Sequence, residues 1–419
     1  MRILVVGSGG REHALAWKLA QEAEVIVAPG NPGIAQDCET VPVQAKDFEG
    51  LASLCKDRDI DLVVVGPEDP LIAGLGNHLR KAGILVYGPN ADGAQLEGSK
   101  SFSKTLMREA GVPTAEFESF DDPDAASEFA KRRFAAGKGV AVKASGNALG
   151  KGVVVADTFE EAEDAIRRFM IAKEFGPAGE TIVIEDRLVG PEFSLLTIVS
   201  EESYWSLPVA QDHKRAYDGD LGPNTGGMGA FSPVPWISPD LIEEVENTIV
   251  VPTLKALKER GISYRGTLFS GIMMESGKPY CLEFNVRMGD PETQAVMMRI
   301  ESGYAAALLA AAKGDSIPPI TISEQASLTV VVCAENYPTA GSKGAQISIG
   351  DLPAGSKLFH AGTALTDGDL VTNGGRVFAA TALAPTIATA REQAYQAADA
   401  VLFEGARYRS DIGAITTPN

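Results

Sequence analysis

The stretch CLEFNVRMGDPET, residues 281–293, alternates apolar and polar side chains until a Gly-Asp-Pro break ends the pattern. Alternation with a period of two predicts a β-strand with one buried face. We expect the apolar side chains of this strand, beginning with Leu282, to be buried. Its opposite face would then carry a carboxylate, an amide and a guanidinium close together, from Glu283, Asn285 and Arg287.

These three groups suit the handling of a metal-bound polyphosphate. The oxygens of Glu283 and Asn285 are hard ligands of the kind that magnesium takes together with substrate phosphates. Arg287 offers a planar fork to a carboxylate or a phosphoryl oxygen. We expect Asp290 and Pro291 to be the N-cap and the first residue of a helix. A surface strand with an Arg–Glu ion pair is the alternative interpretation.

A glycine-rich loop that could wrap phosphates follows Lys143. This lysine lies on the polar face of the predicted strand GVAVKAS, residues 139–145, and the loop runs on to Gly152 with Lys151 at its tip. The pattern is not a P-loop, because Gly-Lys-Gly here opens a strand rather than a helix. A β-hairpin turn with a solvated lysine is the alternative.

The first hundred residues predict a doubly wound parallel sheet. MRILVVGSGGREHALAWKLA, residues 1–20, reads as a buried strand, a glycine turn and an amphipathic helix. Further apolar strands follow at residues 25–28, 62–66 and 84–87, with helical stretches between them. Repeated strand–helix units are typical of parallel α/β sheets, whose ligands bind at the loops after the strands. We expect such a site here.

The first of these loops is an incomplete dinucleotide fingerprint. Residues 7–12 begin as Gly-x-Gly but place Glu12 where the third glycine belongs, and no acidic residue ends the second strand. A nicotinamide-dependent oxidoreductase is therefore a disfavoured alternative. The turn at Gly9 and Gly10 can still bind a simple phosphate, because it opens a helix.

The remainder of the chain divides into two further parts. A helix with Lys100 and Lys104 follows Ser99, strands are expected between residues 181 and 199, and irregular Gly- and Pro-rich chain is expected over residues 211–239. From residue 326 the sequence is β-rich with a last helix near the end. We predict domains at residues 1–102, 103–325 (with a lid subdomain at about 119–187) and 326–419.

Charge and composition exclude several kinds of partner. The 419 residues include 56 acidic and 37 basic ones, for a net charge of −19, which disfavours a nucleic-acid partner. Four cysteines and four histidines are scattered, so neither a zinc site nor a disulfide framework is expected. No stretch predicts a signal peptide or a membrane span. We expect a cytoplasmic protein.

Several motifs together resemble a known family. They are VKASGNALGKGV, IEDRLVGPEFS, QDHKRAYDGDLGPNTGGMGAFSP and LEFNVRMGDPETQ in the middle of the chain, VVGSGGREHAL, PGNPG and GPEDPL before them, and HAGT and VTNGGRV after them. In this order and over essentially the whole chain, they resemble the phosphoribosylamine–glycine ligase family of the ATP-grasp superfamily. The QDHKR and PNTGGMG motifs are typical of that family in particular.

The resemblance implies a multidomain fold of α/β and α+β type. It implies a central ATP-grasp domain with a mobile lid and a small C-terminal α+β domain. It also implies an ATP-dependent ligase of purine biosynthesis, which joins glycine to 5-phosphoribosylamine through a glycyl phosphate and releases ADP and phosphate. The implied metal is Mg²⁺, with Mn²⁺ as an alternative, and a transient contact with the enzyme that supplies the amine is implied as well.

The resemblance also implies roles for individual residues. The residues expected to bind ATP, with the backbone of 185–188 facing adenine and Glu192 facing ribose, are Lys104, Lys143, Gly150, Lys151, Gly152, Glu185, Asp186, Leu188 and Glu192. The expected metal ligands are Glu283 and Asn285, and the expected catalytic residues are Lys143, Arg287, Gly289 and Asp290. The expected substrate-binding residues are Gly9, Gly10, Arg11, Glu12, Gly30, Asn31, Pro67, Glu68, Asp212, Lys214, Asn224, Thr225 and Gly226.

The chain departs from the family pattern at two places. Ser145 stands where the family usually has an aspartate, and the strand before the LEFNVR stretch has no carboxylate before Glu275 to complete a metal site. The alternatives are another ATP-grasp ligase of the purine pathway, which carboxylates or formylates its substrate, and a non-catalytic ATP-binding regulatory subunit.

Overall fold

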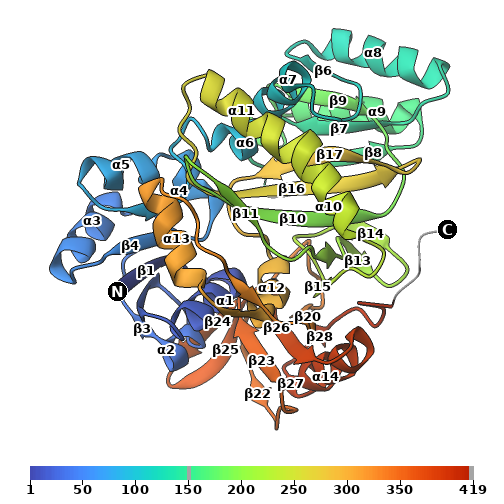
Figure 1. Cartoon of the computed structure of the whole chain (residues 1–419). Coiled ribbons are helices and arrows are strands. Elements are labelled where there is room, and N and C mark those ends of the chain that lie inside the picture. The colour runs from blue at the N-terminus through green and yellow to red at the C-terminus, as the bar shows by residue number, and fades with distance from the viewer. Residues whose placement is uncertain (149–151, 415–419) are drawn as a thin grey trace.

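The computed structural model describes residues 1–148 and 152–414. Figure 1 shows three groups of elements: an N-terminal sheet on the left, a subdomain with α8 and α9 at the upper right, and C-terminal strands at the bottom. Among the described residues, no helix combines the length and apolar character needed to cross a membrane. All four cysteines are free thiols.

The N-terminal sheet is parallel throughout, as predicted. Its strand order is β3-β2-β1-β4-β5. The strands are β1 (Arg2–Gly7), β2 (Glu24–Pro29), β3 (Glu39–Thr40), β4 (Leu62–Val65) and β5 (Val86–Tyr87). The helices of this part are α1 (Gly10–Leu19), α2 (Ile34–Asp37), α3 (Phe48–Asp57), α4 (Glu68–Ile72), α5 (Leu75–Lys81) and α6 (Gln95–Gly98). The strand order reverses at β1, so the loops after β1 and β4 open at one crevice.

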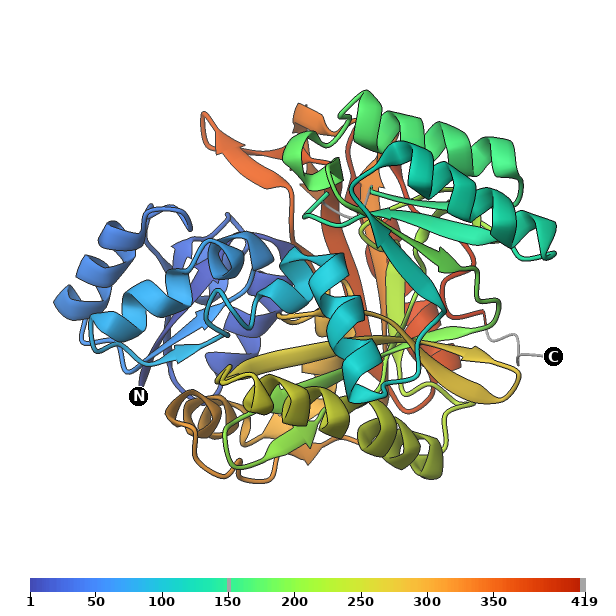
Figure 2. The same ribbon diagram turned by 90° about the horizontal axis from the view of Figure 1, so that it is seen from above.

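A second sheet forms a subdomain with its own hydrophobic core. Its order is β6-β9-β7-β8, from strands β6 (Phe117–Phe120), β7 (Val140–Ala144), β8 (Val153–Ala156) and β9 (Ile182–Asp186). Helices α8 (Pro123–Ala135) and α9 (Phe159–Ile166) pack against these strands in a cluster separate from the other two cores. The subdomain lies apart from the N-terminal sheet when seen from above (Figure 2). Apart from the start of β6, these elements fall within residues 119–187, the range predicted for the lid subdomain.

The central sheet contains the first five residues of the CLEFNVRMGDPET stretch, in strand β17. Its order is β11-β10-β16-β17, from β10 (Glu192–Val199), β11 (Tyr204–Ser206), β16 (Gly266–Glu275) and β17 (Lys278–Asn285). A bulge shifts the β16–β17 register, because Gly271 pairs with Glu283 whereas Ile272 pairs with Cys281. Leu282 is therefore the extra residue and is only half-buried, so the prediction that it is buried is wrong. Cys281 is buried instead.

The segment predicted to be irregular contains four short strands. They are β12 (Gln211–Asp212), β13 (Arg215–Tyr217), β14 (Leu221–Asn224) and β15 (Gly229–Ser232). Strand β15 pairs with β20 (Ala326–Ala334), and β20 pairs with β26 (Arg376–Ala384). The central and C-terminal segments thus share one sheet, of order β12-β15-β20-β26-β23, with β28 also paired to β20. The predicted domain boundary at residue 325 stays a prediction.

The other elements complete the central and C-terminal parts. The helices are α7 (Lys100–Ala110), α10 (Pro239–Val245), α11 (Val251–Glu259), α12 (Glu292–Arg299), α13 (Tyr304–Lys313) and α14 (Ile387–Asp399). The strands are β18 (Ile300–Ser302), β19 (Thr321–Ile322), β21 (Ser342–Gln346), β22 (Ser348–Ile349), β23 (Ser356–His360), β24 (Thr363–Thr366), β25 (Asp369–Gly374), β27 (Val401–Leu402) and β28 (Ala406–Arg407). Every residue of α12 is buried, since this helix packs between α1 and the sheet that contains β15, β20 and β26.

Candidate active site

A cavity with a volume of about 630 Å³ lies among the lid subdomain, the central sheet and the loops around it. It brings together most of the predicted site residues from these distant segments. Those that line it are Arg11, Glu68, Lys104, Lys143, Gly152, Glu185, Asp186, Leu188, Glu192, Asp212, Lys214, Asn224, Thr225, Gly226, Glu283, Asn285, Arg287 and Asp290. Gly150 and Lys151 lie outside the described residues.

Two lysines of this cavity share one buried carboxylate. Lys104 Nζ lies 2.5 Å from Glu185 Oε2, and Lys143 Nζ contacts the other oxygen of the same group. Burial opposes ionisation of Glu185, but the charges of Lys143 and Lys104 outweigh it and lower its pKa. Glu185 therefore keeps both ammonium groups fixed on the cavity wall. That arrangement suits phosphate binding, whereas the predicted contact of residues 185–188 with adenine stays a prediction.

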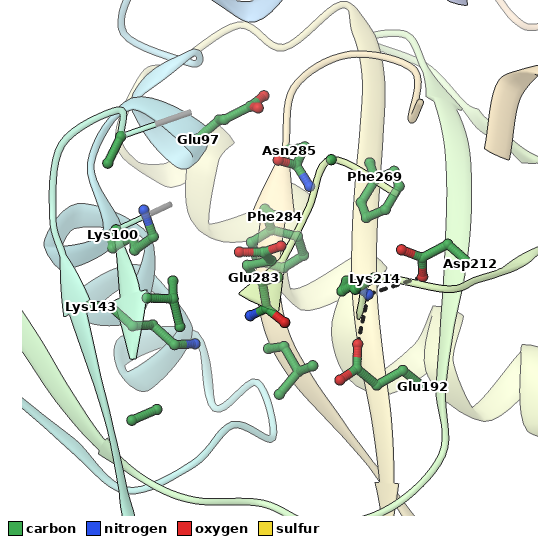
Figure 3. A pocket seen from close by; sticks show the side chains of 18 of the residues that line it. Glu97, Lys100, Lys143, Glu192, Asp212, Lys214, Phe269, Glu283, Phe284 and Asn285 are labelled. Carbon is green, nitrogen blue, oxygen red and sulfur yellow. Dashed lines mark hydrogen bonds and ion pairs between the residues drawn. The ribbon is translucent and has the colours of Figure 1, made fainter. Parts of the chain in front are cut away.

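The predicted metal ligands lie side by side on β17. Glu283 and Asn285 both line the cavity, and Figure 3 shows them projecting between Lys143 and Asp212. Among the described residues, the Glu283 carboxylate has no hydrogen-bond or ion-pair partner. No group of three or more His, Cys, Asp or Glu side chains in that part of the chain could hold a metal by itself. Two oxygen ligands fit Mg²⁺, which completes its shell with water and substrate phosphates.

Arg287 is held in place by two glutamates from the N-terminal part. Its Nε lies 3.1 Å from Glu68 Oε2, and its Nη2 lies 2.7 Å from Glu97 Oε1. Burial favours the neutral form of Glu68, yet Arg287 and Arg11 hold its pKa down to about 2. At Glu97 burial prevails and raises the pKa to about 7. An Arg–Glu ion pair, which was the alternative interpretation of this stretch, is present, but it lies inside a cavity and not on a surface strand.

Arg11 and Glu12 extend this ionic chain to the first glycine loop. Arg11 Nε donates to Glu12 Oε1 at 2.6 Å, and Glu12 Oε2 accepts from the Gly9 N–H at 2.6 Å. A Cβ at Gly66 would lie 2.2 Å from Glu12 Oε1, so the Glu12 side chain fills the space beside this loop. Glu12 shapes the loop from behind, and neither it nor Pro67 is among the residues that line the two cavities.

A second cavity of about 350 Å³ lies where the N-terminal loops meet the C-terminal strands. Five predicted residues line it, namely Gly9, Gly10, Gly30, Asn31 and Asp290. Residues of the HAGT and VTNGGRV motifs complete the lining, namely Ala361, Gly362, Thr363, Asn373 and Arg376. The Asn31 amide joins the two sides, since its Nδ2 donates to the carbonyls of Ser8 and His360, each at 2.8 Å.

Asp290 and Arg376 line both cavities. Arg376 Nη2 lies 2.6 Å from Asp290 Oδ2, and Arg376 Nη1 donates to the Gly226 carbonyl at 2.6 Å. The prediction that Asp290 caps the following helix is wrong, because α12 begins at Glu292 after Pro291 and has no side-chain cap. The carboxylate of Asp290 is instead bound by Arg376 and by Gln294, whose Nε2 donates to it at 2.8 Å.

The acceptor side of the larger cavity has its own ionic cluster. Lys214 Nζ lies 2.6 Å from Glu192 Oε2 and 3.0 Å from Asp212 Oδ1. Dashed lines mark both contacts in Figure 3. Burial would lower the pKa of Lys214, but Asp212 and Glu192 raise it well above its ordinary value. Glu192 thus contacts a lysine here, and its predicted contact with ribose stays a prediction.

The carboxylate of Asp186 has structural partners. It accepts from Arg133 Nε and from Lys138 Nζ, both at 2.6 Å, so it binds α8 and the loop after it to β9.

The local sequence patterns missed several residues that line the cavities. Among them are Glu97, Lys100, Glu292, Tyr337 and Arg376. Glu292 and Arg376 belong to the GDPET and VTNGGRV motifs, so the resemblance covers them without giving them a role. Nothing in the sequence around Glu97 distinguishes it from a surface glutamate.

Comparison with known proteins gives consistent results along the whole chain. Residues 1–97, 98–293 and 327–415 match the N domain, the ATP-grasp (A) domain and the C domain of phosphoribosylglycinamide synthetase. A phosphoribosylamine–glycine ligase from Rhodopirellula baltica is 44% identical over 421 residues, which cover 98% of this chain and 96% of that protein. The human trifunctional purine biosynthetic protein adenosine-3 is 44% identical over 422 residues, which cover 98% of this chain but 42% of that protein.

Solved structures give the same result. A phosphoribosylamine–glycine ligase from Thermotoga maritima has a TM-score of 0.87 at 36% identity and covers 98% of this chain and 100% of its own. The biotin carboxylase domain of Hydrogenobacter thermophilus 2-oxoglutarate carboxylase, in complex with MgADP, has a TM-score of 0.73 at 18% identity, covers 97% of this chain and 91% of its own, and shows the fold alone. With three successive domain matches and full-length relatives above 40% identity, the chain belongs to the phosphoribosylglycinamide synthetase family.

Proposed function

We propose that the protein joins glycine to 5-phosphoribosylamine and converts ATP into ADP and phosphate, through a glycyl phosphate intermediate. The product is glycinamide ribonucleotide. The observation that carries this proposal is the pair of cavities that share Asp290 and Arg376. One cavity holds the groups suited to Mg-ATP and a carboxylate, and the other has the glycine loops suited to a sugar phosphate.

The first step activates a carboxylate. An oxygen of the glycine carboxylate attacks the γ-phosphorus of ATP, the bond to the β-phosphate oxygen breaks, and ADP leaves. Lys104 and Lys143, held by Glu185, bind the phosphates of ATP, and the Arg287 fork orients the attacking carboxylate. Glu283 and Asn285 would hold Mg²⁺, which supplies positive charge to the phosphates when it is bound. Mn²⁺ is the alternative ion.

The second step forms the carbon–nitrogen bond. The amine nitrogen of phosphoribosylamine attacks the acyl carbon, the bond from that carbon to the phosphate oxygen breaks, and phosphate leaves while the amine loses a proton. The sugar phosphate would lie among the residues of the second cavity, near Gly9 and Gly10, with its amine toward Asp290 and Arg376. Acyl phosphates hydrolyse in water, so we include a lid, the subdomain of β6–β9, which closes over the intermediate.

The remaining parts of the proposal concern context. The chain acts in the cytoplasm on small molecules, with neither nucleic acid nor membrane as a partner. We retain the division into residues 1–102, 103–325 and 326–419. A transient contact with the enzyme that supplies phosphoribosylamine would shorten the time which that amine spends in solution.

The test is the dependence of phosphate release on each substrate. Phosphate should appear only when Mg-ATP, glycine and phosphoribosylamine, formed in place from ribose 5-phosphate and ammonia, are present together. Glycine labelled with ¹⁸O in its carboxylate should transfer one labelled oxygen to phosphate. Formation of AMP and pyrophosphate would refute the acyl-phosphate route. Phosphate release driven by bicarbonate or formate would assign the protein to another ligase reaction of the purine pathway.

A further inference from the structure

Glu292 is a buried carboxylate that lines the larger cavity without a cation of its own. Its exposed fraction is 4%, and its Oε1 accepts a hydrogen bond from Ser194 Oγ at 3.1 Å. Among the described residues, no lysine, arginine or histidine lies within ion-pair distance of it. Burying an ionised carboxylate without a cation is costly, so a positively charged ligand would stabilise this group.

The surroundings of Glu292 have an excess of negative charge. Asp212 lines the same cavity, and burial together with the charge of Asp212 raises the pKa of Glu292 to about 7. Lys214 is already bound by Asp212 and by Glu192. This end of the cavity therefore holds three carboxylates and one lysine. Arg287 also acts on Glu292 electrostatically, but its guanidinium is bound by Glu68 and Glu97.

Gly289 creates the space that Glu292 occupies. A Cβ at this position would lie 2.4 Å from Glu292 Oε2 and 2.8 Å from Phe269 Cε2, so any other residue would displace the carboxylate or the ring. The role expected for Gly289 was contact with the reacting groups. That role stays a prediction, and the structure shows in addition that Gly289 allows the Glu292 carboxylate and the Phe269 ring to pack beside the Arg287 loop.

We propose that Glu292 and Asp212 bind the α-ammonium group of the amino acid while Arg287 binds its carboxylate. This inference rests on the proposed function and adds to it the residues that bind the ammonium group of glycine. The substrate is a zwitterion, and one cavity is lined both by the carboxylates of Glu292 and Asp212 and by the Arg287 guanidinium. The ammonium group does not react, so the same contacts would hold glycine before phosphorylation and glycyl phosphate after it.

The inference has a specific consequence for substrate choice. Simple carboxylic acids such as acetate offer the same carboxylate to Arg287 but no ammonium group to Glu292. A site that hydrogen-bonds and neutralises an ammonium group rejects an analogue that lacks it, because its buried polar groups are then left without partners. The preference for glycine over acetate should therefore depend on Glu292.

The experiment compares glycine with acetate in the first half-reaction alone. Hydroxylamine traps the acyl phosphate as a hydroxamate, so phosphoribosylamine is not needed. Glu292→Gln keeps an acceptor for Ser194 and removes only the charge, and Glu301→Gln, at an exposed position of β18, is the matched control. We expect Glu292→Gln to lower the ratio of kcat/KM for glycine to that for acetate at least tenfold, with KM for ATP within twofold of the original.

Several results would separate the outcomes. An unchanged glycine-to-acetate ratio in Glu292→Gln, at any level of overall activity, would overturn the inference. If Glu292→Gln does not fold, as judged by its thermal unfolding midpoint, Asp212→Asn should lower the same ratio at least threefold, and an unchanged ratio there would overturn it. A wild-type protein that forms no glycyl hydroxamate would refute the proposed function itself.

Discussion

The carboxylate of Asp290 and the guanidinium of Arg376 are joined at 2.6 Å and form a wall that the two cavities share. Asp290 follows the central sheet, whereas Arg376 begins β26 in the C-terminal part. A second bond of Arg376, to the Gly226 carbonyl, ties the PNTGGMG segment to the same point. In the proposed function, an amine bound in the second cavity would meet this pair on its way to an acyl group in the first.

We predict that Arg376→Ala uncouples the two half-reactions. Trapping of glycyl phosphate by hydroxylamine should stay within about fivefold of wild type, while ligation of phosphoribosylamine should fall about 10²-fold. The reason is that the proposed role of Arg376 is to position the amine, which takes part in the second step alone. Steady-state rates of hydroxamate and of ligated product are the measurement. Arg391→Ala, which removes hydrogen bonds to the Ser410 and Ile412 carbonyls, is the control for general weakening of this part. Equal losses in both half-reactions would contradict the prediction.

Glu283→Gln should reduce turnover by about 10²-fold or more without loss of the fold, because one metal carboxylate is replaced by a neutral amide. Titration with magnesium should recover part of the rate. Calorimetry should show that the substitution weakens the binding of Mg-ATP more than it weakens the binding of ATP without magnesium. Glu301→Gln is again the control. Wild-type activity of Glu283→Gln at low magnesium would return Glu283 to an ordinary strand residue.

Arg287→Lys should also lower turnover, by about 10²-fold, although the substitution keeps the positive charge. A lysine ammonium cannot contact Glu68 and Glu97 with the geometry of the guanidinium fork and also face a substrate carboxylate. KM for glycine should rise, whereas the affinity for ATP measured by calorimetry should stay close to wild type. Retention of more than half of the wild-type rate would mean that a point charge suffices at this place.

The contact between the N- and C-terminal parts at His13 and His360 should make the free energy of unfolding depend on pH. His360 is buried beside His13, Lys357 and Asp37, and burial together with the charges of His13 and Lys357 lowers its pKa to about 3. A histidine with a lowered pKa stabilises the fold above its unfolded pKa, near 6.5, and this contribution is lost as the pH falls through 6.5 toward 3. Between pH 7 and pH 5 the loss from His360 should be about 2 kcal/mol.

Urea unfolding of wild type and His360→Gln at the two pH values measures this contribution. The variant should be less stable at pH 7, yet it should lose less stability than wild type on going to pH 5. His78→Gln, on α5, is the control, because that side chain is partly exposed. The same loss in wild type and His360→Gln would assign the acid sensitivity to another group.

The sequence predicted the elements that repeat a local pattern. The parallel N-terminal sheet follows from strands that alternate with helices, and the face of Glu283 and Asn285 follows from a period of two. The partial exposure of Leu282 was not predicted, because a bulge is a property of two paired strands and the alternation within one strand cannot reveal it. The strands between residues 211 and 232 were not predicted, because segments of two to four residues are too short to show a period.

The missed site contacts are those between distant parts of the chain. Glu97 contacts Arg287 from a distant part of the sequence, and Arg376 contacts Asp290 from the C-terminal part. Such contacts depend on how the parts pack, and no local pattern encodes this. Arg376 and Glu292 belong to motifs on which the resemblance rests, but a motif gives the presence of a residue and not its contacts.

The pairing of β15 with β20 also sets an order of events during synthesis of the chain. Gly229 is opposite Val330, so β15 leaves the ribosome well before the strand that covers its second edge. The N-terminal sheet needs no later strand and can close on the nascent chain, whereas β12 and β15 must wait with one edge bare. Bare strand edges invite pairing with other molecules, so this interval is where a chaperone would matter most.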